Sequence, residues 1–468
     1  MQETGEKAAH AASTKRAALF TAVTAAFLTP FMGSSVNLAL PLIGKQFEID
    51  AVLLSWISAS YLLSAAMFLV PIGRVADIYG RKKIFLSGLS IFTVSLLLCG
   101  LAPSAMALIV FRFIQGLGSA MVFGTGMAIL TSVFPPHERG RALGVTIAAV
   151  YVGLSAGPLV GGFLAEHLGW RSVFLATTPL GLIAVFQVMV RLKGEWADAR
   201  GESFDSGGSI IYSFALLVLV LGFSRLPESL GIWMILAGVV FLAIFLWWET
   251  RQKSPILNID LFVRNKVFAF SNLAALINYS ATFAVVFLLS LYLQYVKGLT
   301  PQLAGLILAS QPVTMAALSP LAGRLSDRIE PGVVASVGMA MTTVGLALLT
   351  VLDEATSLAF VVSTLFILGL GLALFSSPNT NAVMSSVESK HYGIASGTVG
   401  TMRLVGQMLS MGLAMMLLAI YVGRDQILPE NHDAFLVAMK LAFIVSAALC
   451  FGGIFASLAR GRLRGKPP

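Results

Sequence analysis

Two arginines lie inside long apolar stretches of this sequence, where a charged side chain is costly. Arg112 falls about two turns into a run that begins near residue 105, and Arg403 about three turns into a run that begins near residue 393. An arginine in hydrocarbon normally faces a cavity or a partner, although one near a helix end can extend its head group to the membrane surface. Both are therefore candidates for binding a polar or anionic part of a small molecule.

The apolar runs contain no central Asp or Glu that could bind and release a proton within the membrane. None of the 22 Asp and Glu residues falls in the middle of an apolar run. A buried carboxylate, whose pKa is raised by loss of hydration, is the usual group for binding and releasing a proton near neutral pH. Glu166, beside His167 at the end of an apolar run, is the available substitute, and its alternative interpretation is a solvated loop acid.

Uncharged polar side chains within the apolar runs are the remaining candidates for contact with a substrate. A buried amide in a membrane either binds a ligand or joins two helices. The 31 Phe and 18 Met residues allow an adaptable apolar pocket around them. With the two arginines, the candidates are Ser34, Asn37, Tyr61 and Gln115 in the first half, and Asn272, Asn278, Tyr279, Gln311, Asn379, Asn381 and Gln407 in the second.

The elements that must position these side chains are membrane-spanning helices. The 468 residues are 57% hydrophobic and 11% charged, and the mean hydropathy is +0.87. These values exclude a soluble domain of this size and predict an all-α polytopic membrane protein. Fourteen apolar runs are long enough to cross a bilayer, namely 17–43, 52–75, 84–101, 105–130, 142–165, 172–190, 207–224, 230–248, 267–296, 302–322, 333–352, 358–383, 393–422 and 434–458.

Other classes of function find little support in the composition. Cys99 and Cys450 provide no disulfide framework, and the five histidines have no metal-ligand spacing. The formal net charge of +9 does not indicate nucleic-acid binding, because the basic residues lie at the ends of the runs. No G-x-x-x-x-G-K-[ST] loop is present, and we expect no cleavable signal peptide. We expect no enzyme, cofactor or metal, and a monomer is sufficient.

The basic residues also predict the orientation of the chain in the membrane. An even number of spans puts both termini on one side. Of the 31 Lys and Arg residues, 23 lie in the two tails or in the connections on that side, and six lie on the other. Because cytoplasmic connections of membrane proteins carry the excess of Lys and Arg, we expect a multi-pass protein of the cell membrane with both termini in the cytoplasm.

A repeated pentad predicts how the spans are grouped. Residues 73–77 read G-R-V-A-D after the second span, and residues 323–327 read G-R-L-S-D after the tenth. Two like halves around a midplane site are typical of secondary transporters. The expected divisions are a tail (1–16), a first six-helix bundle (17–192), a linker with the inserted spans 7 and 8 (193–266), a second six-helix bundle (267–458) and a basic tail (459–468).

The fifth span is unusually rich in glycine. It contains Gly144, Gly153, Gly157, Gly161 and Gly162, with Pro158 directly after the third of them. Glycine in an exposed helix costs roughly 1 kcal/mol relative to alanine, whereas in a membrane small residues let another helix approach closely. Proline removes a backbone donor and favours a bend. The pattern predicts a helix that packs tightly against neighbours and moves against them.

Several motifs together resemble those of the major facilitator superfamily. Residues 73–83, G-R-V-A-D-I-Y-G-R-K-K, resemble its loop signature, and residues 112–118, R-F-I-Q-G-L-G, resemble its fourth-helix motif. Residues 144–162 fit its fifth-helix antiporter motif, G-x8-G-x3-G-P-x2-G-G, at every fixed position. Residues 378–381 and 393–403 resemble the fourteen-span drug:proton antiporter branch. The resemblance covers nearly the whole chain and implies two rocking six-helix bundles with an inserted helix pair.

The resemblance also implies roles for the loop signature. Asp77 would cap the N-terminus of a neighbouring helix and pair with Arg81, and such a contact between the halves would hold the outward-facing state. Gly73 and Gly80 flank this carboxylate. Asp327 would be a weaker counterpart in the second half, because Gly80 and the basic cluster have no equivalent after it.

The first span departs from the pattern of the branch. A motif like L-D-x-T-x-x-N-x-A-L-P is typical there, and residues 31–41 read F-M-G-S-S-V-N-L-A-L-P. Met32 thus occupies the position of the aspartate, while Asn37 and the closing A-L-P match. This difference puts proton coupling, rather than transport itself, in doubt.

Three hypotheses follow from these patterns. The first is an antiporter that exports amphipathic, drug-like molecules by alternating access, in exchange for protons or another counter-ion. The second is a facilitator or exchanger of an organic anion bound by Arg112 and Arg403. The third, a sensor or scaffold that transports nothing, is disfavoured because the loop signature and the glycine-rich span are both intact.

Overall fold

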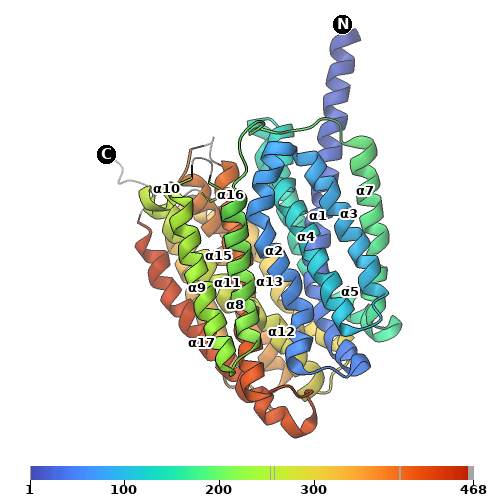
Figure 1. Ribbon diagram of the computed structural model, residues 1–468, viewed down its shortest axis with the longest axis vertical. Helices are drawn as coiled ribbons and strands as arrows, with labels where there is room; N and C mark the ends of the chain where they lie inside the picture. Colours follow the sequence, from blue (N-terminus) through green and yellow to red (C-terminus); the bar gives the residue numbers. More distant parts are fainter. Residues whose placement is uncertain (1, 253–254, 258, 389–391, 462–468) are drawn as a thin grey trace.

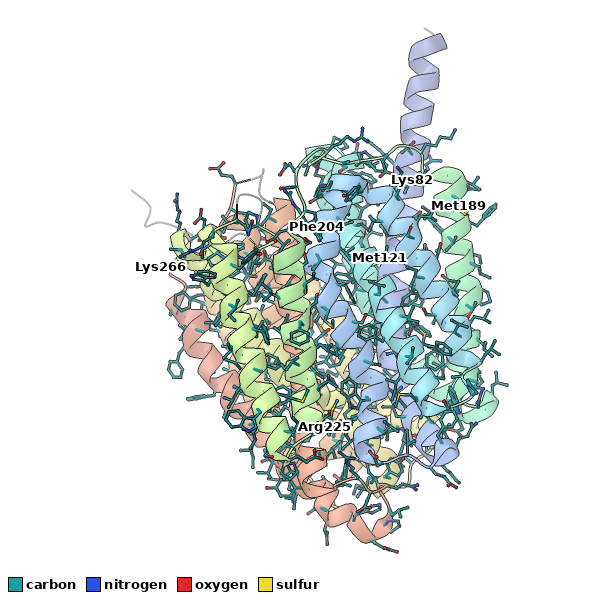
Figure 2. The ribbon with its side chains drawn as sticks, viewed as in Figure 1. Lys82, Met121, Met189, Phe204, Arg225 and Lys266 are labelled. Carbon is teal, nitrogen blue, oxygen red and sulfur yellow. The ribbon has the colours of Figure 1, made fainter. Side chains whose placement is uncertain are left out.

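The computed structural model describes residues 2–252, 255–257, 259–388 and 392–461, and those residues form helices and connections with no strand among them. Fourteen helical segments in the described part are long and apolar enough to cross a membrane, as the sequence predicts. Both ends of the described chain lie at the same face of the bundle (Figure 1), here called the termini face. Lys82 and Lys266 lie near this face and Arg225 lies at the opposite face (Figure 2).

The first half contains six spans in seven helices. Helix α1 begins at Gln2, so the segment expected as a tail continues the first span (Figure 1). The sixth span is formed by two helices, α6 and α7. The helices are α1 (Gln2–Phe47), α2 (Ala51–Tyr79), α3 (Arg81–Gly100), α4 (Ala105–Val133), α5 (Pro136–Leu168), α6 (Trp170–Leu175) and α7 (Thr178–Arg191).

The second half also contains six spans, which follow the inserted pair and a short helix at the termini face. The inserted pair is α8 (Ser206–Ser224) and α9 (Ser229–Glu249), and the short helix is α10 (Ile259–Arg264). The six spans are formed by α11 (Lys266–Thr282), α12 (Ala284–Leu291) and the π-helical turn η1 (Tyr292–Val296), then α13 (Pro301–Arg328), α14 (Pro331–Leu349), α15 (Leu358–Ser385), α16 (Tyr392–Tyr421), and the 3₁₀ turn η3 (Pro429–Asn431) with α17 (His432–Ala459).

Polar caps mark where several helices begin. The Asp50 carboxylate accepts a hydrogen bond from the Leu53 amide at the start of α2, and the Ser104 hydroxyl does the same for Ala107 at the start of α4. Such caps satisfy backbone donors that have no partner inside the helix. Helix α2 ends at Tyr79, and its C-cap is Gly80, whose φ of 119° is a conformation that favours glycine.

The two halves meet along two pairs of helices. Helix α5 packs against α13, and α2 packs against α16. Helix α8 contacts both α2 and α16, whereas α9 packs mainly on α8 and exposes large apolar side chains such as Trp233 and Trp247. The hydroxyls of Tyr212 and Ser213 on α8 donate to the backbone carbonyls of Ala66 and Met67 on α2, at 3.0 and 3.1 Å.

The ninth span, expected as one apolar run over 267–296, is a broken helix. Helix α11 ends at Thr282, α12 begins at Ala284, and the last turn is π-helical. The freed amide of Ala284 donates to the hydroxyl of Ser410 on α16, at 3.0 Å. Because lipid cannot satisfy a backbone donor, a break at this depth requires such a partner from another helix.

Candidate transport pathway

Arg112 is the most deeply buried charged group among the candidates, with 1% of its surface exposed. Its Nε donates to the carbonyl of Ile57 on α2 at 3.1 Å, and its Nη1 donates to Oε1 of Gln115 at 2.5 Å. The guanidinium also lies 4.4 Å from the centre of the Tyr61 ring, a favourable cation–π arrangement. All of these partners are neutral, so the guanidinium remains able to pair with an anionic or carbonyl-bearing ligand.

Tyr61 and Gln115 complete a polar group around this arginine. The Tyr61 hydroxyl donates to the hydroxyl of Ser119 on α4 at 2.7 Å. Gln115 is fully buried, and its Nε2 has no hydrogen-bond partner. The sequence-based candidates Arg112, Tyr61 and Gln115 are therefore brought together between α2 and α4. An unpaired buried amide donor costs about 1–3 kcal/mol, which a ligand acceptor would recover.

Asn37 joins the two halves rather than lying free in a pocket. Its side-chain oxygen accepts a hydrogen bond from Ser58 at 3.2 Å, and its backbone oxygen accepts one from Ser290 on α12 at 2.6 Å. Ser34, also on α1, donates to the carbonyls of Pro30 and Phe31 in its own helix, at 2.9 and 3.2 Å. Sequence reasoning missed Ser290, because one serine in an apolar run is not distinctive.

Arg403 forms a second arginine–tyrosine stack, in the other half. Its guanidinium lies 5.4 Å from the centre of the Tyr279 ring. The Tyr279 hydroxyl lies 3.4 Å from that of Ser376 on α15. Unlike Arg112, Arg403 is only half-buried. The structure thus places both intramembrane arginines on aromatic rings.

Several candidate amides of the second half are buried without full hydrogen bonding. Both side-chain polar atoms of Asn278 on α11 and the Oε1 of Gln311 on α13 lack a partner, and so does the Oδ1 of Asn272. Gln407 on α16 is also buried. Gln311 and Gln407 lie on α13 and α16, which pack against the first half, and the two asparagines lie on α11, the first part of the broken span. They are the atoms most in need of a ligand or a bound water.

Asn379 and Asn381 have different surroundings, because both join helices. Asn379 donates to the backbone carbonyl of Ser271 at 3.1 Å and accepts a hydrogen bond from Nη1 of Arg460 at 3.0 Å. Asn381 donates to the Ser326 hydroxyl at 3.1 Å.

The sequence places Arg460 in a basic tail, but the structure packs it among α11, α15 and α17 with 2% of its surface exposed. Burial lowers the pKa of Arg460 to about 10, against the opposing effect of Glu330.

The glycine-rich face of α5 allows close contact with two different helices. A Cβ built at Gly153 would lie 2.5 Å from the Phe27 carbonyl oxygen of α1, and one at Gly161 would lie 2.6 Å from Cβ of Ser35. Gly162 instead faces α13, where a Cβ would lie 2.5 Å from the Pro301 carbonyl oxygen. Gly157 contacts α1, and its carbonyl accepts a hydrogen bond from the Ser35 hydroxyl at 3.0 Å. Pro158 lies within the continuous helix α5.

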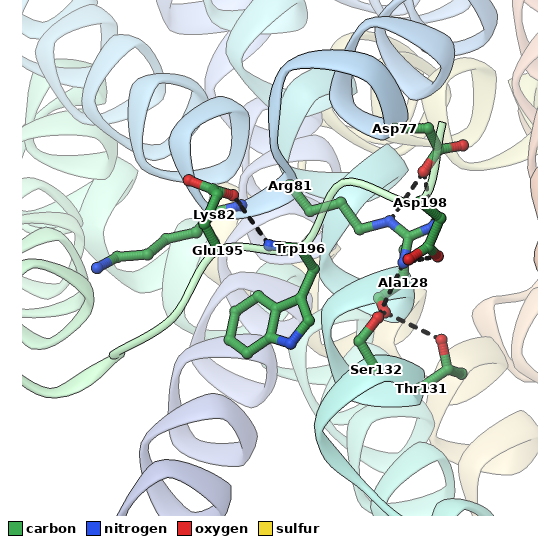
Figure 3. A network of polar contacts seen from close by, with 9 residues as sticks. All are labelled: Asp77, Arg81, Lys82, Ala128, Thr131, Ser132, Glu195, Trp196 and Asp198. Carbon is green, nitrogen blue, oxygen red and sulfur yellow. Dashed lines mark hydrogen bonds and ion pairs between the residues drawn. The ribbon is translucent and has the colours of Figure 1, made fainter. Parts of the chain in front are cut away.

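The loop signature forms a polar network at the termini face (Figure 3). Arg81 pairs with Asp77, with its Nη2 at 2.7 Å from Oδ1, and with Asp198 of the linker at 2.8 Å. Its Nη1 also donates to the Ser132 hydroxyl on α4 at 2.8 Å. The expected Asp77–Arg81 pair is therefore present. The contacts described for Asp77 lie within the first half and the linker, so its contact with the second half stays a prediction.

The linker 192–205 runs across this network and adds contacts that the sequence does not indicate. The amide of Lys82 donates to Oε1 of Glu195 at 2.8 Å, and the amide of Ala199 donates to the carbonyl of Asp77 at 3.0 Å. No large side chain fits at Gly80, because a Cβ there would meet the Glu195 carboxylate. Gly73 has open space around it. Asp327, the counterpart on α13, takes part in interactions of its own.

Glu166 joins the two halves at the face opposite the termini. Its Oε2 accepts a hydrogen bond from the backbone amide of Gln302 at 3.0 Å, at the N-terminus of α13, and its side chain also contacts Thr300. The neighbouring His167 lies 2.9 Å from Oε1 of Gln302. The Glu166 side chain is exposed. Its geometry is that of a helix cap between the bundles rather than of a buried proton carrier.

The family model described as Major Facilitator Superfamily matches residues 22–249 and 271–468 of the chain. The riboflavin transporter RibZ of Clostridioides difficile (strain 630) is 28% identical over 428 residues, which cover 92% of this chain and 93% of that protein. The multidrug resistance protein Stp of Mycobacterium tuberculosis (strain CDC 1551 / Oshkosh) is 32% identical over 396 residues, covering 83% of this chain and 73% of Stp. The drug efflux pump JefA of the same strain is 30% identical, covering 88% and 83%.

Two solved structures have the same fold at low sequence identity. A mutant of the peptide transporter POT in complex with alafosfalin has a TM-score of 0.72 and 14% identity, with 95% of each chain covered. A bacterial homologue of the human lysosomal transporter Spinster, inward-facing and unoccupied, has a TM-score of 0.65 and 17% identity, with 97% of this chain and 99% of that chain covered. With fourteen spans and a family match over both halves, this chain belongs to the Major Facilitator Superfamily of membrane transporters.

Proposed function

We propose that this protein is a secondary-active antiporter that exports amphipathic small molecules by alternating access of its two bundles. The observation that carries the proposal is the set of buried, unpaired polar atoms in both halves, namely those of Gln115, Asn278 and Gln311. Within a membrane there is no bulk water to satisfy such atoms. A substrate with both polar and apolar surface would supply the missing hydrogen bonds and pack against the apolar side chains around them.

The orientation is part of this proposal. The excess of Lys and Arg on the termini side supports a cytoplasmic position for that face. The opposite face would then be external, and polar contacts between the halves gather there. They include the hydrogen bond of Glu166 to α13 and the amide of Ala51 donating to the carbonyl of Asp425 at 3.0 Å, while the bond between Ser290 and Asn37 lies deeper in the bundle. In this orientation, the present conformation would be the one closed to the outside.

The named relatives support the breadth of the substrate class. Stp and JefA are named for multidrug resistance and drug efflux, and RibZ is named as a riboflavin transporter. Riboflavin combines a flat aromatic ring system that bears carbonyl groups with a hydroxylated chain. Such a molecule would stack on an aromatic side chain and accept hydrogen bonds from a guanidinium, which are the groups that Tyr61 and Arg112 offer.

Protons are the proposed counter-ion, although the usual acid is replaced. Met32 is fully buried on α1, and no Asp or Glu of the sequence falls in the middle of an apolar run. Proton movement would then depend on carboxylates at the ends of the spans. Glu166 lies at one such end, where its hydrogen bond from the Gln302 amide makes its charge part of the contact between α5 and α13.

The function is tested by transport into proteoliposomes that carry an imposed pH gradient. We expect riboflavin and a lipophilic cationic dye to move against their gradients when protons flow the opposite way, and not to do so when an ionophore collapses the pH difference. Movement of either molecule that does not respond to the pH gradient would overturn proton antiport. If neither molecule is bound or moved at all, the proposed substrate class is wrong.

An organic-anion exchanger is the second candidate, and one observation favours it. Arg112 is buried with only neutral hydrogen-bond partners, and a buried cation of this kind is a natural site for a carboxylate. In the same liposomes, an aromatic carboxylate would then exchange across the membrane without a pH gradient. Uptake of the carboxylate, but not of the dye, would select this function.

Glu166→Ala is expected to weaken closure of the outer side. It removes the carboxylate that accepts the Gln302 amide at the N-terminus of α13, a loss typically worth about 1 kcal/mol, which corresponds to about a fivefold shift toward the outward-open state. The shift is measured by distances between spin labels at Leu168 and Leu303, which are both exposed at the opposite face. Glu48→Ala removes another exposed acid at that face and is the control. An unchanged distance distribution in Glu166→Ala would contradict the gating role.

A further inference from the structure

Two carboxylates face each other at the termini-face end of the inserted helix pair. Asp205 is the N-cap of α8 and Glu249 is the last residue of α9. A Cβ built at Gly208, between them, would lie 2.5 Å from Oδ2 of Asp205 and 2.6 Å from Oε1 of Glu249. The glycine thus leaves the space in which the two carboxylate oxygens meet.

The hydrogen bonds of this pair are incomplete. Asp205 accepts bonds from the amide of Gly208 at 2.9 Å and from Nε1 of Trp248 at 3.1 and 3.3 Å. Glu249 accepts one from the amide of Leu257 at 2.8 Å through Oε2. Its Oε1 has no partner, although only 3% of the residue is exposed. A buried oxygen that faces a second carboxylate lacks a donor, since ionised carboxylates only accept hydrogen bonds.

No described basic side chain supplies that donor. Asp205 is the charged group that acts on the Glu249 carboxyl. The guanidinium of Arg251, two residues further on, lies over the Trp247 ring at 4.3 Å, and Arg74 pairs with Glu202 at 2.5 Å. The segment 255–257, which packs against the pair, contributes no charged side chain. Among the described residues no group of three possible ligands could hold a metal ion.

We propose that Asp205 and Glu249 form a proton-binding site in which one shared proton lies between Oδ2 and Oε1. With the proton bound, the pair is one carboxylic acid hydrogen-bonded to one carboxylate, and every buried oxygen has a donor. Without it, two like charges meet across Gly208 and repel each other. This site goes beyond the proposed function, because it does not depend on the nature of the substrate.

The proton would control how the inserted pair is attached to the rest of the molecule. By accepting a hydrogen bond from the amide of Leu257, Glu249 holds the segment that leads to α10 and the second half. Ile256 and Leu257 pack on a cluster formed by α2, α8, α9 and α16, which includes Met67 and Met408. Deprotonation would loosen this anchor at a point where both halves meet. The pair is therefore placed to make the conformational equilibrium depend on pH at the termini face.

The proposal is tested first by infrared difference spectroscopy of the full-length protein in lipid nanodiscs. We expect the wild type to show the carbonyl band of a protonated carboxylic acid at neutral pH and to lose it at alkaline pH. Glu249→Gln and Asp205→Asn should each lack the band, because an amide replaces the proton-sharing partner. Glu202→Gln, an exposed acid paired with Arg74, should retain it. A wild type without the band, or a band that survives in both variants, would overturn the site.

Hydrogen exchange at the Leu257 amide gives a second measurement that does not depend on the spectrum. After correction for the intrinsic exchange rate, we expect wild-type protection to fall about tenfold across the pH range in which the band is lost, because repulsion between the two charges loosens the anchor that holds this amide. In Glu249→Gln, where the amide mimics the protonated acid, protection should stay within about twofold across the same range. Equal pH dependence in both proteins would contradict the proposed role of the proton.

Discussion

Gly162→Ala is expected to block transport while leaving the protein folded. In the present conformation the added methyl group would lie 2.5 Å from the carbonyl oxygen of Pro301, a backbone atom that cannot rotate away. Overpacking of this kind costs about 1–3 kcal/mol, and here the cost falls on the present conformation, in which α5 touches α13. The conformational equilibrium should therefore shift about 5- to 150-fold away from this conformation.

Two further substitutions make this prediction specific. Gly144→Ala, on the same helix, has no atom within 4 Å of the added methyl group and should transport normally. Gly305→Ala, on α13, would press on the carbonyl of Pro158 from the other side and should reproduce the defect. The unfolding temperature of these variants should not fall in proportion to their transport rate, since alanine is a better helix former than glycine. Full activity of Gly162→Ala would show that the α5–α13 contact is not part of the cycle.

Arg112→Met is expected to lower the affinity for riboflavin by about 10- to 150-fold, the equivalent of one hydrogen bond to a charged group. Methionine keeps most of the apolar stem but removes the charge and the donors that lie over Tyr61. A lipophilic cation without acceptor groups should still bind, because Tyr61 and the surrounding apolar side chains remain. Binding is measured by the ligand-dependent rise in unfolding temperature, which follows from mass action.

The matched control is Arg251→Ala, because Arg251 also stacks on an aromatic ring, at 4.3 Å from the centre of Trp247, but lies exposed at the termini face. Its loss should leave the affinity for both ligands unchanged. Loss of binding only for an aromatic carboxylate would support the organic-anion function instead. Unchanged binding of every ligand to Arg112→Met would remove Arg112 from the site.

The sequence was sufficient for those features that depend on the local pattern. Each apolar run became a span, because apolar length alone determines which segments cross a bilayer. The glycines at 153, 161 and 162 lie at close helix contacts, as their spacing predicts, whereas Gly144 lies in open space. The Asp77–Arg81 pair is one turn apart on the sequence and could be expected from that spacing.

The features that the sequence could not reveal depend on partners far away in the chain. The break after Thr282 occurs without proline or glycine and is compensated by Ser410, 126 residues later. Arg460 follows an apolar run and resembles a topology signal, yet Ser271 and Asn379 bind it inside the second half. Asn379, a candidate for substrate contact, is occupied by that network. Glu249 is buried against Asp205 only because α8 and α9 form a hairpin.

We propose that the two halves move against each other, and the attachment of α8 would then determine which half carries the inserted pair. Tyr212 and Ser213 fasten α8 to the backbone of α2, whereas Phe223 meets α16 by packing on Gly412. The inserted pair would therefore move with the first half. The exposed side chains of α9, such as Trp233 and Trp247, would displace lipid during that movement. The resistance of the lipid to this movement of α9 grows with the viscosity of the surrounding acyl chains. Turnover of this transporter should slow in ordered, viscous membranes even when substrate affinity is unchanged.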